Sequence, residues 1–119
     1  MFGGGETHDG LSSDVVDIFD STSQKWSTAT LSQPRYCIGA TSVGKYALFA
    51  GGFKNETWDT VDIFDSETLK WEVDHLSVQR ACLAATSIGQ YALFGGGVID
   101  GGTPLDTVDV FDGSKWFAT

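Results

Sequence analysis

The sequence predicts an all-β protein whose repeated units, each of four antiparallel strands, are blades of a β-propeller. Trp26, Trp71 and Trp116 recur at a spacing of 45 residues. Short strands repeating with a period in the forties are typical of propeller blades. β-Branched and aromatic residues dominate, and no apolar i, i+3, i+4 stripe is sustained, which argues against helices. Four further features recur at that spacing: Arg35 and Arg80, Cys37 and Cys82, Tyr46 and Tyr91, and Gly51-Gly52 and Gly96-Gly97.

Residues 1–31 are expected to form a partial blade that lacks its inner strand. The opening residues M-F-G-G-G match the end of the second strand of the two later units, so the first strand has no counterpart in this unit. A polar loop spans residues 6–13. The two remaining strands are expected at residues 14–20 and 26–31.

Residues 35–76 are expected to form a complete blade. The first strand carries the small residues G-A-T-S, as a crowded inner strand requires. Gly44 supplies the positive φ of a two-residue hairpin turn. The second strand is almost continuously apolar, which indicates cover on both faces. At Gly51-Gly52 a side chain would obstruct a close backbone approach or a left-handed bend. The four strands are expected at residues 36–43, 46–50, 60–65 and 70–76.

Residues 80–119 repeat the pattern as a second complete blade. The loop after Gly97 is two residues longer than the one after Gly52. The last hairpin is two residues shorter, and Asp112-Gly113 can make its tight turn.

These repeats resemble the kelch repeat. An Arg opens the first strand, Gly-Gly ends the second, V-x-x-F-D lies in the third, and Trp follows some six residues on. The usual Tyr-Asp is Phe-Asp here, which removes a hydroxyl and keeps the ring. The resemblance implies four-stranded blades, commonly six to a ring, with the first strand of each blade lining a central channel.

Fewer than three blades leave a propeller incomplete, since closed rings have about four to eight. If closing the two apolar flanks buries on the order of 1,000 Å² of apolar surface, the gain is roughly 25 kcal/mol before association costs. We therefore expect either further repeats or self-association. Two chains approximate a six-bladed ring, so the predicted state is a homodimer.

Charge narrows the range of partners. The 119 residues carry a formal charge of −9, and the seven basic residues are scattered. Nucleic acids and anionic membranes are bound by Lys/Arg clusters, so neither partner is expected. No apolar run approaches the ~20 residues that cross a bilayer.

The loops after the Gly pairs differ most between repeats, and loops on a rigid scaffold commonly carry binding. These are residues 6–13, 53–58 and 98–105, where exposed apolar side chains can anchor a partner. Asn55-Glu56-Thr57 is a glycosylation sequon, relevant in a secreted protein. The candidate ligand contacts are Glu6, His8, Arg35, Tyr36, Phe53, Trp58, Arg80 and Val98.

Several of these residues also have a structural interpretation. The resemblance implies that Arg35 and Arg80 tie neighbouring strands through backbone or carboxylate contacts. It also implies that the two positions after each Arg reach the channel mouth; these are Tyr36-Cys37 and Ala81-Cys82, which are not basic, so an acidic peptide is not favoured. The equivalent cysteines are expected to be small core-facing residues in separate strands rather than a disulfide. Reduced cysteines weakly favour the cytoplasm.

Catalysis is not expected. No H-E-x-x-H, G-x-S-x-G or phosphate loop occurs. The two histidines are isolated, and Asp20, Asp65 and Asp112 are expected to cap turns, so no metal or cofactor is predicted. The predicted function is a non-catalytic scaffold that presents its loops to a protein partner. The alternative is part of a propeller enzyme or carbohydrate-binding propeller with its active groups elsewhere.

Overall fold

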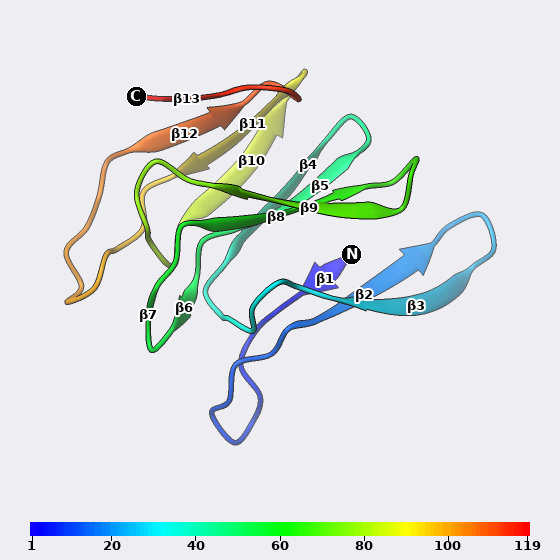
Figure 1. Cartoon of the computed structure of the whole chain (residues 1–119), viewed down its shortest axis with the longest axis horizontal. Coiled ribbons are helices and arrows are strands. Elements are labelled where there is room, and N and C mark those ends of the chain that lie inside the picture. Colours follow the sequence, from blue (N-terminus) through cyan, green and yellow to red (C-terminus); the bar gives the residue numbers. More distant parts are fainter.

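The computed structural model describes all 119 residues and contains three antiparallel sheets that do not close into a ring. The sheets follow one another across the molecule in chain order (Figure 1). None of the elements is an apolar helix of membrane-spanning length. The first sheet has three strands in the order β1-β2-β3: β1 Phe2–Gly3, β2 Val15–Asp20 and β3 Lys25–Thr30.

The second and third sheets have four strands each, in equivalent orders. In both, the first two strands form a hairpin, and a longer connection leads to the outer pair. The second sheet consists of β4 Gly39–Val43, β5 Tyr46–Ala50, β8 Thr60–Asp65 and β9 Lys70–His75. The third consists of β10 Ala84–Ile88, β11 Tyr91–Gly95, β12 Val108–Phe111 and β13 Trp116–Ala118.

The turns have the predicted chemistry. Gly44 and Gly89 have φ values of 57° and 56° in the two-residue turns of β4–β5 and β10–β11. Three aspartates at the ends of β2, β8 and β12 accept backbone N–H bonds from the turn that follows, as expected. These aspartates are Asp20, Asp65 and Asp112.

Apolar side chains fill the spaces between successive sheets. The larger cluster joins the second and third sheets around Leu48 and Phe94, which are both fully buried. The smaller cluster joins the first and second sheets around Val16 and Phe49, with Trp71 packed against it. Each sheet interior is therefore completed by its neighbour.

The Gly pairs allow the close approach that the sequence predicted. A Cβ on Gly51 would lie 2.5 Å from the Arg80 carbonyl oxygen. The Gly52 amide donates to that same oxygen at 2.9 Å, and the Gly5 amide donates to the Arg35 carbonyl at 3.0 Å. The Gly pairs of the first and second units thus receive the Arg backbone of the next unit.

Two local features differ from the prediction. The strand expected at 36–43 begins only at Gly39, because Cys37 has a φ of 57° that interrupts an extended chain. The loop after Gly52 contains a small unpredicted hairpin, in which β6 (Phe53–Lys54) pairs with β7 (Glu56–Thr57).

Candidate binding site

A cavity of about 230 Å³ lies where the second sheet meets the third, on the side of the loops that follow the Gly pairs. Three of the predicted contacts, Tyr36, Phe53 and Val98, line it together. We call it the rim pocket. Its other lining residues are Cys37, Thr57, Ala81, Cys82, Ile99, Asp100, Gly101 and Gly102.

Backbone bridges hold the two sides of the rim pocket in equivalent ways. On one side, the Tyr36 and Phe53 amides each donate to the other's carbonyl, at 3.1 and 2.8 Å. On the other, Ala81 and Val98 do the same, both at 2.9 Å. The Tyr36 and Phe53 rings meet edge to face with centroids 5.6 Å apart. The apolar wall is therefore fixed by main-chain contacts rather than by free loops.

Cys37 and Cys82 both line the rim pocket and form a disulfide, which corrects the prediction of two separate core-facing residues. Their Cα atoms are 4.5 Å apart, within the range that a disulfide requires. Both residues are exposed, and the Cys82 amide donates to the Cys37 carbonyl at 2.7 Å. The weak preference for the cytoplasm depended on reduced cysteines and loses that support.

One carboxylate shapes the polar edge of the rim pocket. Asp100 accepts a bond from the Thr57 amide at 2.8 Å and another from the Gln79 side chain at 3.4 Å. The Thr57 hydroxyl oxygen is buried and has no partner. No basic side chain lines the pocket, so its polar edge is acidic.

Trp58 and the first loop lie outside the rim pocket. The Trp58 indole donates to the Lys54 carbonyl at 3.2 Å, so this side chain packs locally against the β6–β7 hairpin. Glu6 and His8 are exposed on the loop between β1 and β2. That loop, the β6–β7 hairpin and the loop after β11 all extend to one side of the molecule, the lower part of Figure 1.

Arg35 and Arg80 are completely buried, which removes both from the surface that a ligand can reach. Arg35 bonds the Asp62 carboxylate at 2.8 Å and the carbonyls of Gln33, Phe49, Gly51 and Thr60. Arg80 pairs with Asp109 at 2.8 Å and also bonds the Phe94 carbonyl, but its Nε and Nη1 have no partner. Both arginines therefore tie strands together, as the structural interpretation proposed.

Sequence reasoning missed Asp62 and Asp109 as the partners of these arginines. Both lie inside β8 and β12 and are 2% exposed. A buried carboxylate requires a charged or strongly donating partner. Their recurrence with Arg, once in each complete unit, is the signal that could have identified the pair.

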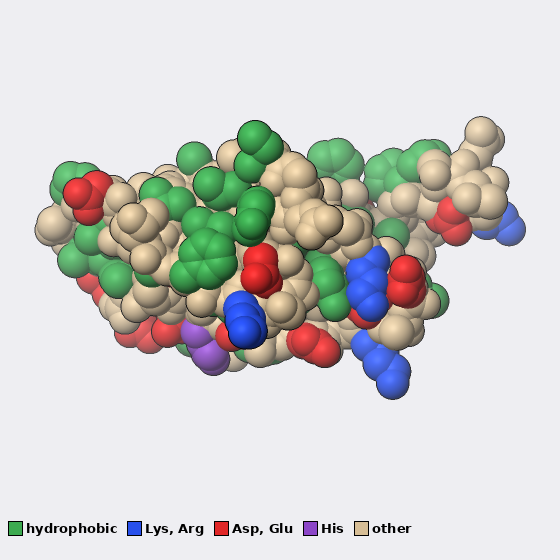
Figure 2. Space-filling model, turned by 90° about the horizontal axis from the view of Figure 1, so that it is seen from above, with side chains coloured by type: hydrophobic (Ala, Val, Ile, Leu, Met, Phe, Trp, Pro, Cys, Tyr) green, Lys and Arg blue, Asp and Glu red, His purple; other side chains and the backbone are tan.

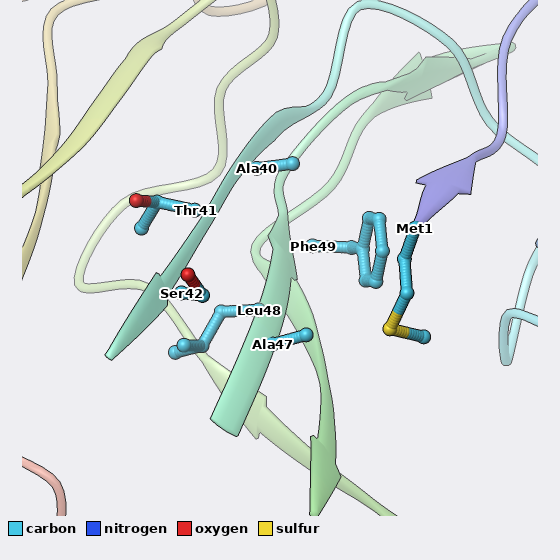
Figure 3. A pocket seen from close by; sticks show the side chains of 7 residues that line it. All are labelled: Met1, Ala40, Thr41, Ser42, Ala47, Leu48 and Phe49. Atoms are coloured by element: carbon cyan, nitrogen blue, oxygen red, sulfur yellow. The ribbon is translucent and has the colours of Figure 1, made fainter. Parts of the chain in front are cut away.

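A second cavity, of about 370 Å³, opens beside β1 (Figure 3). The Met1 side chain lies next to the Phe49 ring, while Leu48 points away to the other face of β5. The edge of β1 that faces away from β2 pairs with no strand. The cavity therefore adjoins the place where the other two units have an inner strand.

The perturbed carboxyl groups lie at hairpin ends and not in the rim pocket. Backbone N–H bonds from Lys115 and Ser114 lower the pKa of Asp112, and those from Thr22 and Ser23 lower the pKa of Asp20. These are the shifts of turn caps. No group of three or more His, Cys, Asp or Glu is placed to hold a metal ion.

Comparison with protein-family models finds no family that matches this chain, and a search of curated proteins also finds no match.

Proposed function

We propose that the chain is a kelch-type propeller segment that acts as a non-catalytic binding module, with the rim pocket as the place where a protein partner inserts. The observation that carries the proposal is the convergence of Tyr36, Phe53 and Val98 on one pocket at the join of two sheets. These residues come from separate loops, and apolar side chains gathered in a concave site are typical of interface anchors.

The chemistry of the rim pocket favours one kind of partner group. Its wall is aromatic and aliphatic, and its polar edge carries Asp100 without a basic neighbour in the lining. An apolar side chain followed by a Lys, Arg or backbone N–H donor complements both parts. An acidic peptide is disfavoured, in line with the net charge of −9.

We further propose that a second copy covers the exposed flanks, giving a homodimer that approximates a six-bladed ring; further repeats in the same chain are the alternative. Ile88 and Phe117 are 70% and 51% exposed on the third unit, and Trp26 is 61% exposed on the first. Figure 2 shows one face of the molecule on which hydrophobic side chains lie exposed in several groups. Exposed apolar area of this kind marks association surfaces.

The binding proposal is tested by site-specific photo-crosslinking. A crosslinker placed at Phe53 or at Val98 is expected to capture a protein. Val98→Ser is expected to abolish capture by the crosslinker at Phe53, and Phe53→Ser is expected to abolish capture by the crosslinker at Val98. Leu69→Ser is the control, because Leu69 is also apolar, is more exposed than the half-buried Phe53 and Val98, and lies in the β8–β9 turn away from the rim pocket. Capture of the same partners by all variants contradicts the proposal. Binding to a glycan array that depends on the rim pocket supports the carbohydrate alternative instead.

A further inference from the structure

We propose that the Cys37–Cys82 disulfide is a thiol-exchangeable cross-link that sets the rigidity of the rim pocket. A low-molecular-weight thiol of the glutathione class is the co-reactant. The role of the rim pocket as a binding site rests on the proposed function, whereas the exchange chemistry of the disulfide does not.

The first support is the position of the bond. It joins equivalent residues of two successive repeats and is the single covalent link between them other than the chain itself. Both cysteines are exposed, so a thiolate can approach either sulfur. Exposed disulfides are the labile and regulatory ones, whereas buried disulfides resist exchange.

The second support is the coupling of the bond to the rim pocket. Cys37 follows Tyr36, and Cys82 follows Ala81; these are the two residues whose backbone bridges hold Phe53 and Val98. A movement of either cysteine is therefore transmitted to both pocket walls. The Cys82 amide bond to the Cys37 carbonyl crosses the same join.

The exchange reaction balances in two steps. A thiolate attacks one sulfur, the Cys37–Cys82 bond breaks, and the second cysteine leaves as a thiolate that takes up a proton from water. A second thiol then attacks the mixed disulfide. The chain gains two thiols, and the small thiol leaves as its own disulfide, so two electrons pass from the small thiol to the protein.

The structure indicates that reduction loosens the pocket without unfolding the chain. Gly39, two residues after Cys37, lies close to Leu83, the residue after Cys82, and the cluster around Leu48 and Phe94 continues to join the two sheets. These contacts do not depend on the sulfur atoms. The hairpin at residues 53–57 and the loop at residues 98–105 are bridged to Tyr36 and Ala81, the residues next to the two cysteines, so the added motion is expected in these two segments.

The experiment uses the native protein in glutathione redox buffers of increasing reducing power. Alkylation and mass spectrometry count free thiols, and hydrogen exchange follows the peptides that cover residues 53–58, 81–83 and 98–105. We expect a reversible change from no free thiol to two per chain. Amide exchange in those peptides should rise by about tenfold or more, while the β2–β3 peptides stay unchanged, because local opening sets the exchange rate. The double variant Cys37→Ser/Cys82→Ser should show the fast exchange in every buffer.

Four results would overturn the inference. They are a disulfide that resists reduction until the chain is denatured, free thiols that persist in oxidised glutathione, reduction with unchanged exchange at the pocket, and reduction that unfolds the β2–β3 peptides as well. All of these readouts work without a partner. A failure of the crosslinking experiment alone therefore removes the binding proposal and leaves the exchange chemistry standing.

Discussion

Val43 and Ile88 occupy equivalent positions in successive units, yet Val43 is 7% exposed and Ile88 is 70% exposed. The difference is not in the residues, since both are β-branched and apolar. Val43 belongs to the cluster that the third sheet completes, and nothing packs on the far side of Ile88. Burial of a side chain in this protein therefore depends on the neighbouring unit as much as on the local sequence.

The same lesson applies to the two arginines. The Nε of Arg35 donates to the Gly51 carbonyl, and Gly51 and Gly52 are held by the backbone of Arg80 in the next unit. The Gly96 position has no such neighbour, and two guanidinium nitrogens of Arg80, Nε and Nη1, have no partner. A following unit thus completes the ion-pair site of the unit before it.

The largest expected effect comes from breaking the two Arg–Asp pairs. Arg35→Met should lower the free energy of unfolding by about 3–5 kcal/mol, because Asp62 is left buried without its partner. Arg80→Met should cost about 1–3 kcal/mol less, because it also removes donors that are already unpaired. Urea unfolding of both variants measures the difference. Equal losses of unfolding free energy in the two variants would contradict a difference between the two ion-pair sites.

The disulfide links the second and third units, and its removal is expected to cause the next largest loss of stability. The double variant Cys37→Ser/Cys82→Ser lacks the cross-link that constrains the unfolded chain. For a separation of 45 residues, this loss should lower the free energy of unfolding by roughly 3–4 kcal/mol. Thermal or urea unfolding under oxidising conditions, against the reduced wild type as control, checks the value. A variant as stable as the oxidised protein contradicts a formed disulfide.

A smaller effect is expected for apolar truncation. Val43→Ala should lower the free energy of unfolding by about 1.5–2 kcal/mol, since about 0.8 kcal/mol is lost per buried carbon group. Ile88→Ala should stay within about 0.5 kcal/mol at dilutions that separate the copies. Unfolding curves of both variants, recorded over a series of protein concentrations, measure how much of each effect depends on association of the copies. If Ile88→Ala costs as much as Val43→Ala at every dilution, the third unit is covered from within the chain.

The smallest effect is the pH dependence of the turn caps. The folded pKa of Asp112 lies below its ordinary value of 3.8, because the Lys115 and Ser114 amides bond its charged form. Its contribution to stability is therefore present above pH 3.8 and is lost as the pH falls through the lower folded-state pKa. Asp112→Asn should flatten the fall of the urea midpoint between neutral and acidic pH. Identical pH profiles for variant and wild type would exclude the cap as a contributor.

Most of the strand layout could be predicted from the sequence, because each strand carries a local signal. The apolar run at Tyr46–Ala50 and the positive-φ glycine before it appear where expected. The disulfide could not be predicted, because the register that brings Cys37 to Cys82 depends on how two sheets pack. The Asp62 and Asp109 pairs had a signal, the recurrence of Arg and Asp in each complete unit, but that recurrence does not show that the two side chains meet, since Arg35 precedes β4 and Asp62 lies on β8.

The candidate site was predicted in part. Phe53, Val98 and Tyr36 meet because the loops of adjacent units share one side of the molecule. Trp58 packs on its own hairpin, and Glu6 and His8 belong to the unit farther away. The side chains of the two arginines lie inside, where each pairs with a buried carboxylate that requires a charged partner.

Molar mass in solution, measured by light scattering over a range of concentrations, tests most directly whether another unit covers the exposed flanks. We expect a dimer for the wild type and a lower mass for Ile88→Lys, with Leu11→Lys as the control on an exposed loop residue. A monomer at all concentrations that still unfolds in one sharp transition would contradict it.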